Sequence, residues 1–439
     1  MNFVRRLLSN GTGLLLVLGG YFLVLQEAFP EGGWAQTILH LGVLFLSGYF
    51  LGELGSLARL PRVVCYLAAG ILLGGSGLHW VGKNELEDLT SVNDLALGLI
   101  AYGAGMHLEW SVLRPKIYLV TLFVGFLPLL VFTGIMGLFF FAGNALLAGF
   151  PPAMTQSLPL LLAGVAMSLS PASTIAVIRG MRSKGVFSET VLSIVVAVDL
   201  VVIVLFALIL ARTADGLPHT NYTEASMVAE LVVSLGLGGI LGWLLNRGGG
   251  HGPAMARFWL VVSALALASV TRQTTVYLMV HYQFAFHIEP IIVCLVAGVY
   301  LRNASRAPEE FERAITWLSI PVFVVFFAMA GAVMRLDVLA DHWPLAGLVF
   351  LVRWAGLEAG SRLAAWMGGE TPSLRGLYGR AFLPQAGVSI LLAMEVSRRI
   401  PDWGMEASAV LLAVIAVNEL VGPAALQWML GKAKAVKAA

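Results

Sequence analysis

Charged residues are scarce in this sequence: they make up only 12% of its 439 residues, whereas hydrophobic residues make up 59%. A soluble globular domain carries about 25% charged residues. The mean hydropathy of +0.86 agrees with this shortage of charge. The composition therefore excludes a soluble globular protein and predicts an all-α, polytopic membrane protein whose main partner is the lipid bilayer.

Other chemistry is missing as well. The two cysteines, Cys65 and Cys294, lie in apolar segments far apart in the sequence, so we expect small buried residues rather than a disulfide or a metal site. Basic runs interleaved with aromatic residues do not occur, so nucleic acid is not an expected partner. The sequence offers no nucleophile–base pairing and no metal-ligand cluster, which argues against an enzyme and against a cofactor.

Long apolar runs are what the sequence does contain. A membrane-spanning helix needs about 20 mostly apolar residues, and scanning for such runs predicts 13 or 14 transmembrane helices, with 254–302 the least certain division. The candidate segments are 11–26, 34–58, 61–79, 90–110, 116–143, 158–181, 187–212, 226–246, 254–271, 284–302, 314–334, 342–367, 374–397 and 405–430.

The two ends of the sequence have their own character. Residues 1–33 resemble a signal peptide, because Arg5 and Arg6 precede an apolar core. No small-residue cleavage site follows, so we expect a retained extra N-terminal helix. Residues 432–439 form a short basic tail.

Positive charge in the loops predicts the orientation. If the N-terminus is cytoplasmic, nineteen Lys and Arg residues fall on the inner side of the membrane. Only six fall on the outer side: Lys83, Arg212, Arg272, Arg335, Arg398 and Arg399. Inner loops carry the excess of Lys and Arg, so both termini are predicted to be cytoplasmic, in a bacterial inner membrane.

The helices after the first one divide into six, one and six. A single linker helix between two groups of six places the second group in the opposite orientation, as in many secondary transporters. We therefore expect a first inverted repeat at 34–212, a linker segment at 213–253 and a second inverted repeat at 254–431.

The fifth helix of each repeat is interrupted at a comparable place. Segment 158–181 contains Pro171 and segment 374–397 contains Pro384, and proline removes a backbone donor and clashes with the preceding turn. Broken helices that cross at mid-membrane aim their half-helix ends at one point, where amides and carbonyls can coordinate an ion. Polar residues flank both prolines: Ser170, Ser173, Thr174 and Gln385.

The helix after the first break, 187–212, carries one acid in an otherwise apolar run, "SIVVAVDLVVIVLF" at 193–206. This residue, Asp199, lies near the middle of its helix and hence near the midplane of the membrane. A carboxylate there costs about 2.5–3.5 kcal/mol on insertion scales. We therefore predict that Asp199 and the first break share one site for an ion and a proton.

Four other polar residues lie within predicted helices. Arg353 could bind the dipole ends or carbonyls of the broken helix 374–397, or form an ion pair with Glu358 or with an acid of another helix. Glu419, with Asn418, is the rough counterpart of Asp199 in the second repeat. It could be a second titrating group, but we favour a structural hydrogen-bonding role.

Six segments, taken in order, resemble the monovalent cation:proton antiporter superfamily, and most closely its bacterial branch of sodium/proton and potassium-efflux exchangers. Together they extend over nearly the whole chain. The segments are "LPRVVCYLAAGILLGGSGL" (60–78), "SPASTIAVIRGMRSKGVFSETVLSIVVAVDLVVIVLFAL" (170–208), "IEPIIVCLVAGVYLRN" (288–303), "FVVFFAMAGAVMRLDVL" (323–339), "LPQAGVSILLAMEV" (383–396) and "NELVGPAALQWML" (418–430).

This resemblance implies the sodium/proton antiporter fold and a homodimer, in which a dimerisation domain holds a mobile core that moves like an elevator. It also implies that Asp199 is the essential acid. The sequence departs from the family pattern at Val198, where many members carry Asp, Asn or Gln, and in 314–334, which lacks the Lys of electrogenic members. The chain stops soon after its last helix, so no nucleotide-binding domain is expected.

A single carboxyl group favours a simple exchange. Burial disfavours the ionised form, so Asp199 would bind either a proton or a monovalent cation, and hard cations prefer oxygen ligands. The loaded site is neutral in both cases, which predicts electroneutral one-for-one exchange. Two alternatives remain open: a sodium-coupled symporter of organic anions, and a non-transporting regulatory subunit. The sequence does not choose between Na⁺ and K⁺.

Overall fold

The computed structural model describes residues 2–26, 34–58, 60–183, 185–214, 224–249, 252–282, 288–334, 336–385, 388–400 and 402–438. These residues form helices and no strands. The helices of the first half are α1 (Asn2–Gln26), α2 (Trp34–Leu57), α3 (Arg62–Leu73), α4 (Lys83–Asp88), α5 (Thr90–Met106), α6 (Trp110–Leu113), the 3₁₀ turn η1 (Arg114–Lys116), α7 (Ile117–Leu146), α8 (Pro152–Ala166), α9 (Pro171–Gly180) and α10 (Val186–Ala214).

The second half continues in the same way. Its helices are α11 (Glu224–Gly249), α12 (Pro253–Tyr282), α13 (Pro290–Ala304), α14 (Pro308–Val333), α15 (Leu336–Asp341), α16 (Trp343–Met367), α17 (Pro372–Arg375), α18 (Tyr378–Ala381), α19 (Val388–Arg399) and α20 (Gly404–Ala438).

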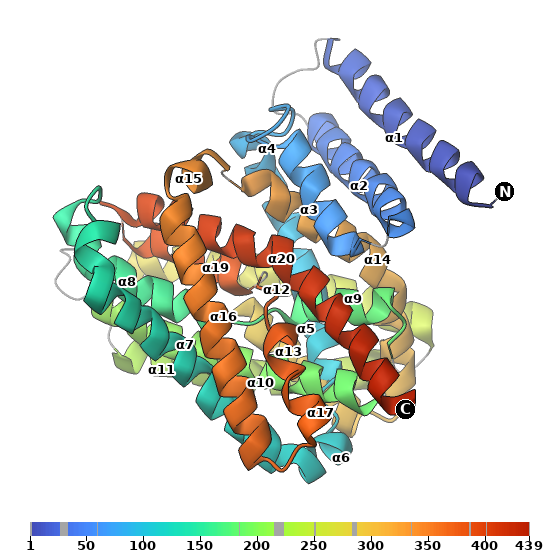
Figure 1. Cartoon of the computed structure of the whole chain (residues 1–439). Coiled ribbons are helices and arrows are strands. Elements are labelled where there is room, and N and C mark those ends of the chain that lie inside the picture. The colour runs from blue at the N-terminus through green and yellow to red at the C-terminus, as the bar shows by residue number, and fades with distance from the viewer. Residues whose placement is uncertain are drawn as a thin grey trace.

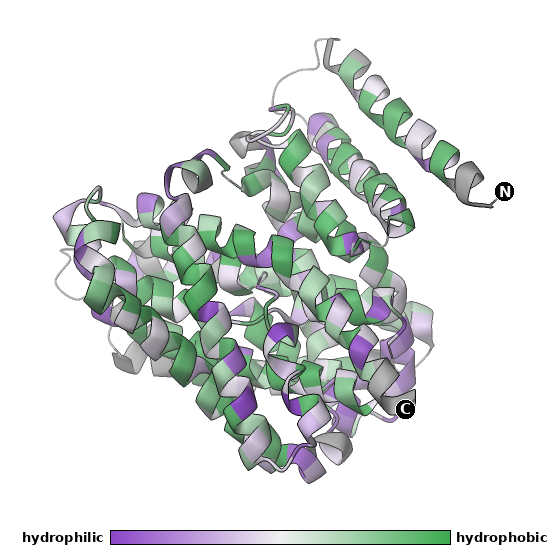
Figure 2. Ribbon diagram, viewed as in Figure 1, coloured by the Kyte–Doolittle hydropathy of each residue, from purple (hydrophilic) through white to green (hydrophobic). Residues whose placement is uncertain are grey.

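Proline sets the start of several of these helices. It occupies the first helical position of α8, α9, α12, α13, α14 and α17. Its missing N–H is one of the donors that a helix start leaves without an intrahelical partner, and its fixed φ suits that position. Figure 2 shows hydrophobic residues along most of the length of the long helices. Local sequence thus fixes where these helices begin, and their composition places them in the bilayer.

Each of the fourteen predicted segments corresponds to helical structure. In the described part of the chain, eight helical segments are long and apolar enough to cross a membrane. The others fall short for visible reasons: α16 carries three charged residues, α1, α3, α5 and α13 have shorter apolar stretches, and the segment 374–397 is interrupted. The prediction of an all-α polytopic membrane protein is confirmed.

Two boundaries differ from the prediction. The helix expected at 254–271 continues as α12 to Tyr282, because the stretch 271–282 contains no Gly or Pro to end it. Its expected successor, 284–302, begins at Pro290 in the described residues, and 283–287 lie outside them. Segment 374–397 is interrupted more than once, since its first part consists of the single turns α17 and α18.

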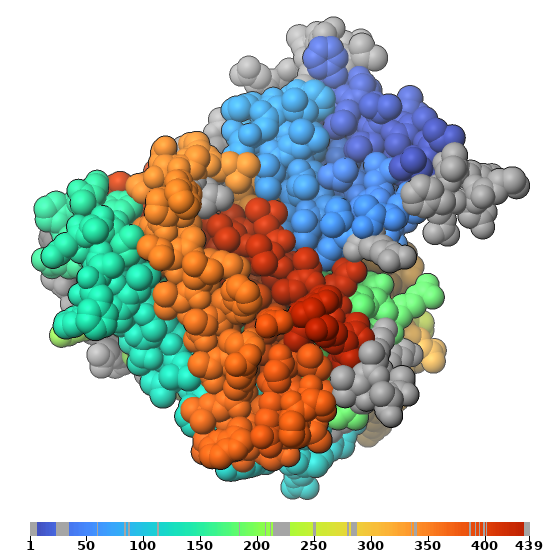
Figure 3. All heavy atoms as spheres, viewed as in Figure 1, coloured from blue at the N-terminus to red at the C-terminus, as the bar shows by residue number. Residues whose placement is uncertain are grey.

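The contacts between helices divide them into two bundles. We call α1–α3, α5 and α11–α14 bundle A, and α7–α10 with α16–α20 bundle B. Within bundle B, α16 packs along α7, and α20 lies between α16 and the segment of bundle A that contains α3 (Figure 3). Contacts between the bundles are much less extensive and join α3 and α5 to α9, α3 to α20, and α10 to α11. The extra N-terminal helix α1 packs against α2 at the edge (Figure 1).

Two helix crossings in bundle A are close because each has a glycine at the point of contact. Helix α3 crosses α14 so closely that a Cβ atom on Gly70 would overlap the carbonyl oxygen of Ala328. Helix α13 crosses α5 in the same way, with Gly298 against the carbonyl oxygen of Tyr102. Both glycines end an L-x-A-G sequence, at 67–70 and at 295–298. Small residues let membrane helices approach closely, and both crossings use a glycine in this way.

Candidate ion-binding site

The first break lies between α8 and α9. Helix α8 ends at Ala166, and α9 begins at Pro171 with Ser170 as its N-cap, whose Oγ accepts a hydrogen bond from the backbone N–H of Ser173 at 3.1 Å. A serine N-cap followed by proline at the first helical position is a strong local start signal. The sequence therefore restarts the helix here after four non-helical residues, 167–170.

The second break lies between α18 and α19 and touches the first. Pro384 and Gln385 lie within it, and residues 386–387 are outside the described part of the chain. The Gln385 side-chain amide donates to the carbonyl oxygen of Val165 at 2.7 Å. The hydroxyls of Ser168 and Ser389 lie 2.5 Å apart. The two interrupted segments therefore cross, although more than 200 residues separate them in the sequence.

Arg353 of α16 binds the carbonyl groups of both breaks. Its guanidinium donates to the carbonyl oxygens of Ala166, Ser168 and Leu383, each at 2.9 Å, and to Asn418 Oδ1 at 2.8 Å. The residue is fully buried. These carbonyls belong to the C-terminal ends of α8 and of the α18 turn, where the helix dipole is negative. Arg353 thus neutralises both ends at once.

Glu419 of α20 accepts hydrogen bonds at the crossing, whereas Arg353 donates them. Its Oε1 accepts from the Ser173 hydroxyl at 2.6 Å, and its Oε2 accepts from the backbone N–H of Gln385 at 3.2 Å. Ser173 in turn accepts from the hydroxyl of Ser170 at 2.9 Å. Both carboxyl oxygens accept hydrogen bonds, which suits an ionised group. Glu419 is fully buried and accepts hydrogen bonds from the first turn of α9 and from the backbone of the second break.

Asp199 of α10 lies on another side of the same crossing. Its side chain is only 2% exposed, and the backbone of Leu169, in the first break, donates a hydrogen bond to its carboxyl group. Its Oδ1 has no hydrogen-bond partner among the described residues. The carboxyl group borders a cavity of about 30 Å³ between the two bundles.

The rest of that cavity is apolar. From bundle B come Pro171 and Ala172, at the start of α9, and Val388, at the start of α19. The wall contributed by bundle A consists of aliphatic side chains: Leu97, Ile100, Ala101, Ala104, Ile291, Ile292 and Leu295. Asp199 thus lies beside both breaks and faces a wall that offers its free oxygen no hydrogen bond.

Other buried oxygens without a partner in the described part of the chain include Thr174 Oγ1, in α9, and Gln385 Oε1, in the second break. Buried polar atoms in native proteins are rarely left unsatisfied, and an exception calls for an explanation such as an ion or a water. Thr174 is one helical turn beyond Pro171, which lines the Asp199 cavity, so it lies on nearly the same face of α9.

The residues named from the sequence differ in their hydrogen-bond partners in the structure. Asp199 and Thr174 keep free oxygens, whereas Ser170 and Ser173 are engaged in capping and in binding Glu419. Arg353 joins the breaks and also binds Asn418. Glu358 pairs with Arg362 at 2.6 Å instead of with Arg353.

Sequence reasoning missed the roles of Leu169 and Ser389. Leu169 acts through its backbone, and Ser389 meets Ser168 only because the helices cross. The positions of both beside a proline-containing break were the only available signal.

Two interrupted helices that cross inside a helical membrane protein, beside a buried carboxyl group with an unused oxygen, define the class of ion-coupled secondary transporters. The family model described as "Sodium/hydrogen exchanger, transmembrane" matches residues 41–430, so the chain belongs to the sodium/hydrogen exchanger family. Members of this family are membrane transporters rather than enzymes, and the chain is an antiporter of this type.

Solved structures share the fold. Two structures of the sodium proton antiporter MjNhaP1 from Methanocaldococcus jannaschii are similar to this chain at 17% sequence identity. The first, at pH 8, gives a TM-score of 0.67 over 91% of this chain and 97% of the other. The second, from electron microscopy, gives 0.71 over 92% and 96%. A search of curated protein sequences found no significant match.

Proposed function

We propose that this protein exchanges one monovalent cation, Na⁺ or K⁺, for one proton, and that the two ions occupy Asp199 in turn. The observation that carries this proposal is the environment of Asp199: a buried carboxyl group with an unpaired oxygen against an otherwise apolar cavity. Burying an ionised carboxylate without a partner is expensive. A bound proton or a bound cation removes that cost, so the two compete for the same group.

The charges around the crossing support an electroneutral exchange. Arg353 and Glu419 are both fully buried, and the two hydrogen bonds that Glu419 accepts suit an ionised carboxylate. With Glu419 ionised, the two residues contribute no net charge to bundle B. The net charge of the crossing then depends on Asp199 alone, and it is zero when Asp199 holds H⁺ or a monovalent cation. Only the loaded, neutral forms can pass the apolar wall of bundle A cheaply.

Oxygen atoms near the crossing supply candidate ligands for the cation. Alkali ions are hard cations and prefer oxygen. We assign Asp199 Oδ1 as the charged ligand and Thr174 Oγ1 and Gln385 Oε1 as neutral ligands, because all three are buried without a partner among the described residues. Ser170 and Ser173 hold the start of α9 in place and can add hydroxyl oxygens.

The packing of the bundles supports an elevator movement of bundle B against bundle A. Bundle B contains both breaks and Asp199, and its contacts with bundle A are sparse compared with the contacts inside each bundle. The matched crossings of α3 with α14 and of α13 with α5 support two structural repeats, in opposite orientations. In this proposal bundle A is the static part and the dimerisation domain of a homodimer, and both termini are cytoplasmic.

The test uses purified protein in liposomes that carry a pH gradient and a pH-sensitive dye. Adding Na⁺, K⁺ or Li⁺ should dissipate the gradient with wild-type protein, and Asp199→Asn should abolish the response because the substituted group cannot exchange a proton. Asp94→Asn is the matched control, since Asp94 pairs with Arg272 at 2.6 Å away from the crossing. This control should exchange normally.

The same liposomes test the stoichiometry and the alternatives. Electroneutral exchange produces no transport current on a solid-supported membrane, whereas a current proportional to protein density contradicts it. A wild-type protein that responds to no cation favours a non-transporting regulatory subunit. Uptake of organic anions that requires Na⁺ but no pH gradient favours a symporter.

A further inference from the structure

Three adjacent cavities, which share lining residues, extend from Asp199 toward a surface that includes the exposed residues Arg182 and Thr316. The largest, which we call the vestibule, has a volume of about 700 Å³ and lies between the bundles, with walls from α3, α5, α9, α10, α13 and α14. A small cavity of about 10 Å³, the neck, shares Gly103, Arg179, Ile315, Ser319 and Phe323 with the vestibule. Ile100 lines both the neck and the Asp199 cavity.

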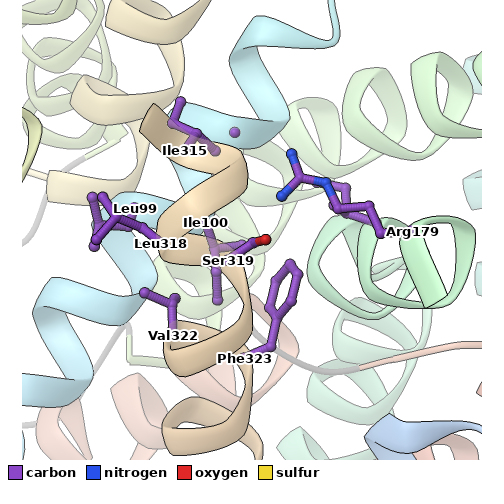
Figure 4. Close-up of a pocket in the computed structure, with 10 residues that line it drawn as sticks. Leu99, Ile100, Arg179, Ile315, Leu318, Ser319, Val322 and Phe323 are labelled. Atoms are coloured by element: carbon purple, nitrogen blue, oxygen red, sulfur yellow. The ribbon is translucent and has the colours of Figure 1, made fainter. Parts of the chain in front are cut away.

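The neck is too small for a hydrated cation. A cavity needs a volume of about 10–15 Å³ to hold a single water molecule, and the volume of the neck is about 10 Å³. Its walls are aliphatic or aromatic apart from Arg179 and Ser319. Figure 4 shows the Arg179 side chain extending from its helix toward α14, where the Ser319 hydroxyl points into the same space. Arg179 belongs to α9 of bundle B, so its side chain reaches across the boundary to bundle A.

Arg179 makes no hydrogen bond and no ion pair among the described residues. The one carboxylate that acts on it electrostatically is Glu312. Glu312 lies seven residues before Ser319 on α14, which is two helical turns or about 10 Å along the axis. It is held by Arg302 at 3.2 Å, and Arg302 also pairs with Glu109. The positive charge in the neck is therefore only partly compensated.

We propose that Arg179 is an electrostatic gate on the cation path between the vestibule and Asp199. In the neck, its guanidinium repels an incoming cation, because the repulsion between like charges is stronger in a narrow apolar passage than in water. Glu312, two turns away on α14, attracts the guanidinium toward the vestibule and out of the neck, which opens the path. Arg179 is a positioning and access residue that makes no contact with Asp199. This inference rests on the proposed exchange function.

Initial exchange rates in liposomes with sorted protein orientation test the gate. Na⁺ or K⁺ is titrated separately on the vestibule side and on the opposite side. Arg179→Gln should lower the KM on the vestibule side about fivefold, on the scale of removing one screened charge, with Vmax within about twofold. Arg179→Lys keeps the charge and should retain the wild-type KM. Glu312→Gln should raise the KM, because the guanidinium then stays in the neck.

Ionic strength gives a second readout that a purely structural role would not change. Choline chloride, added at constant osmolarity, screens charges exposed to water. It should lower the wild-type KM on the vestibule side and leave that of Arg179→Gln unchanged.

An unchanged KM in Arg179→Gln, or shifts of the same sign in Arg179→Gln and Glu312→Gln, overturns the gate. Thermal melting of each variant shows that it is folded. A wild-type protein without any exchange overturns the proposed function itself, whereas wild-type exchange with an indifferent Arg179→Gln overturns the gate alone.

Discussion

Two helices that end the two halves of the chain, α10 and α20, each bring one buried acid to the crossing, and the surroundings of these acids differ sharply. Glu419 on α20 is fully buried, and both of its carboxyl oxygens accept hydrogen bonds, one from Ser173 in α9 and one from Gln385 in the second break. Asp199 on α10 is 2% exposed and has one oxygen without a partner, beside a cavity. Burial alone therefore does not distinguish the two acids, whereas the unused oxygen of Asp199 beside a cavity does.

The comparison extends to charge. Glu419 shares the crossing with Arg353, which also binds its neighbour Asn418 at 2.8 Å. None of the cations that the structure describes pairs with Asp199, and its neighbour Val198 is buried in the hydrophobic core. The α20 side of the crossing is thus built for stability, and the α10 side retains an unsatisfied group, as expected where function conflicts with stability.

The largest effect on stability is expected from Arg353→Met. The substitution leaves three carbonyl oxygens, Asn418 and Glu419 without the guanidinium in a fully buried place. Breaking a buried charge pair costs about 3–5 kcal/mol. Thermal unfolding in detergent measures the change. The control is Arg362→Met on the same helix, because Arg362 is 60% exposed and pairs only with Glu358. Equal losses in the two variants would contradict the assigned role of Arg353.

A smaller loss of stability is expected from Glu419→Gln than from Arg353→Met. Asp199→Asn should behave differently in both stability and exchange. The amide nitrogen of Gln cannot accept a hydrogen bond, so either Ser173 or the Gln385 N–H loses its acceptor, at a cost of about 1–3 kcal/mol. We expect a lower melting temperature and slower exchange, because the charge of Arg353 is then no longer compensated. The exchange should stay electroneutral, since both loaded forms of Asp199 carry the same charge. Asp199→Asn replaces a carboxyl group that is costly to bury in its ionised form, so the melting temperature should stay level or rise while exchange is lost.

Melting temperatures and liposome exchange rates of both variants decide this contrast. Glu406→Gln serves as the control, because Glu406 lies exposed in the first turn of the same helix. Loss of exchange in a folded Glu419→Gln, or a transport current created by it, would make Glu419 a second ion-carrying group.

The smallest effect concerns the cap of the first break. Ser170→Ala removes the side-chain acceptor for the Ser173 N–H at the start of α9, and such substitutions cost about 1 kcal/mol. A modest fall in melting temperature is expected, with exchange retained. Ser193→Ala in the interior of α10 is the comparison, since Ser193 bonds only the carbonyl oxygen of Glu189 in its own helix. A larger loss there than at Ser170 would contradict the capping argument.

Much of the site could be predicted from residue patterns. Asp199 was identified because one carboxylate in a long apolar run is costly, and the breaks because Pro171 and Pro384 interrupt apolar segments beside polar residues. The partners of Arg353 could not be predicted, since every residue has a backbone carbonyl group and the sequence does not show which ones lie near the guanidinium. Serine side chains were expected to face a cation, and the structure engages Ser173 with Glu419 instead.

Composition and periodicity by themselves determined that the chain is a helical membrane protein with two interrupted helices and one costly acid. These properties are local, because hydropathy and proline act within a single helix. Only the tertiary structure decided which buried acid keeps a free oxygen, that Arg353 joins both breaks, and that Arg179 reaches across the boundary between the bundles. Such facts depend on which helices cross, and residues far apart in the chain meet only once the two bundles have packed.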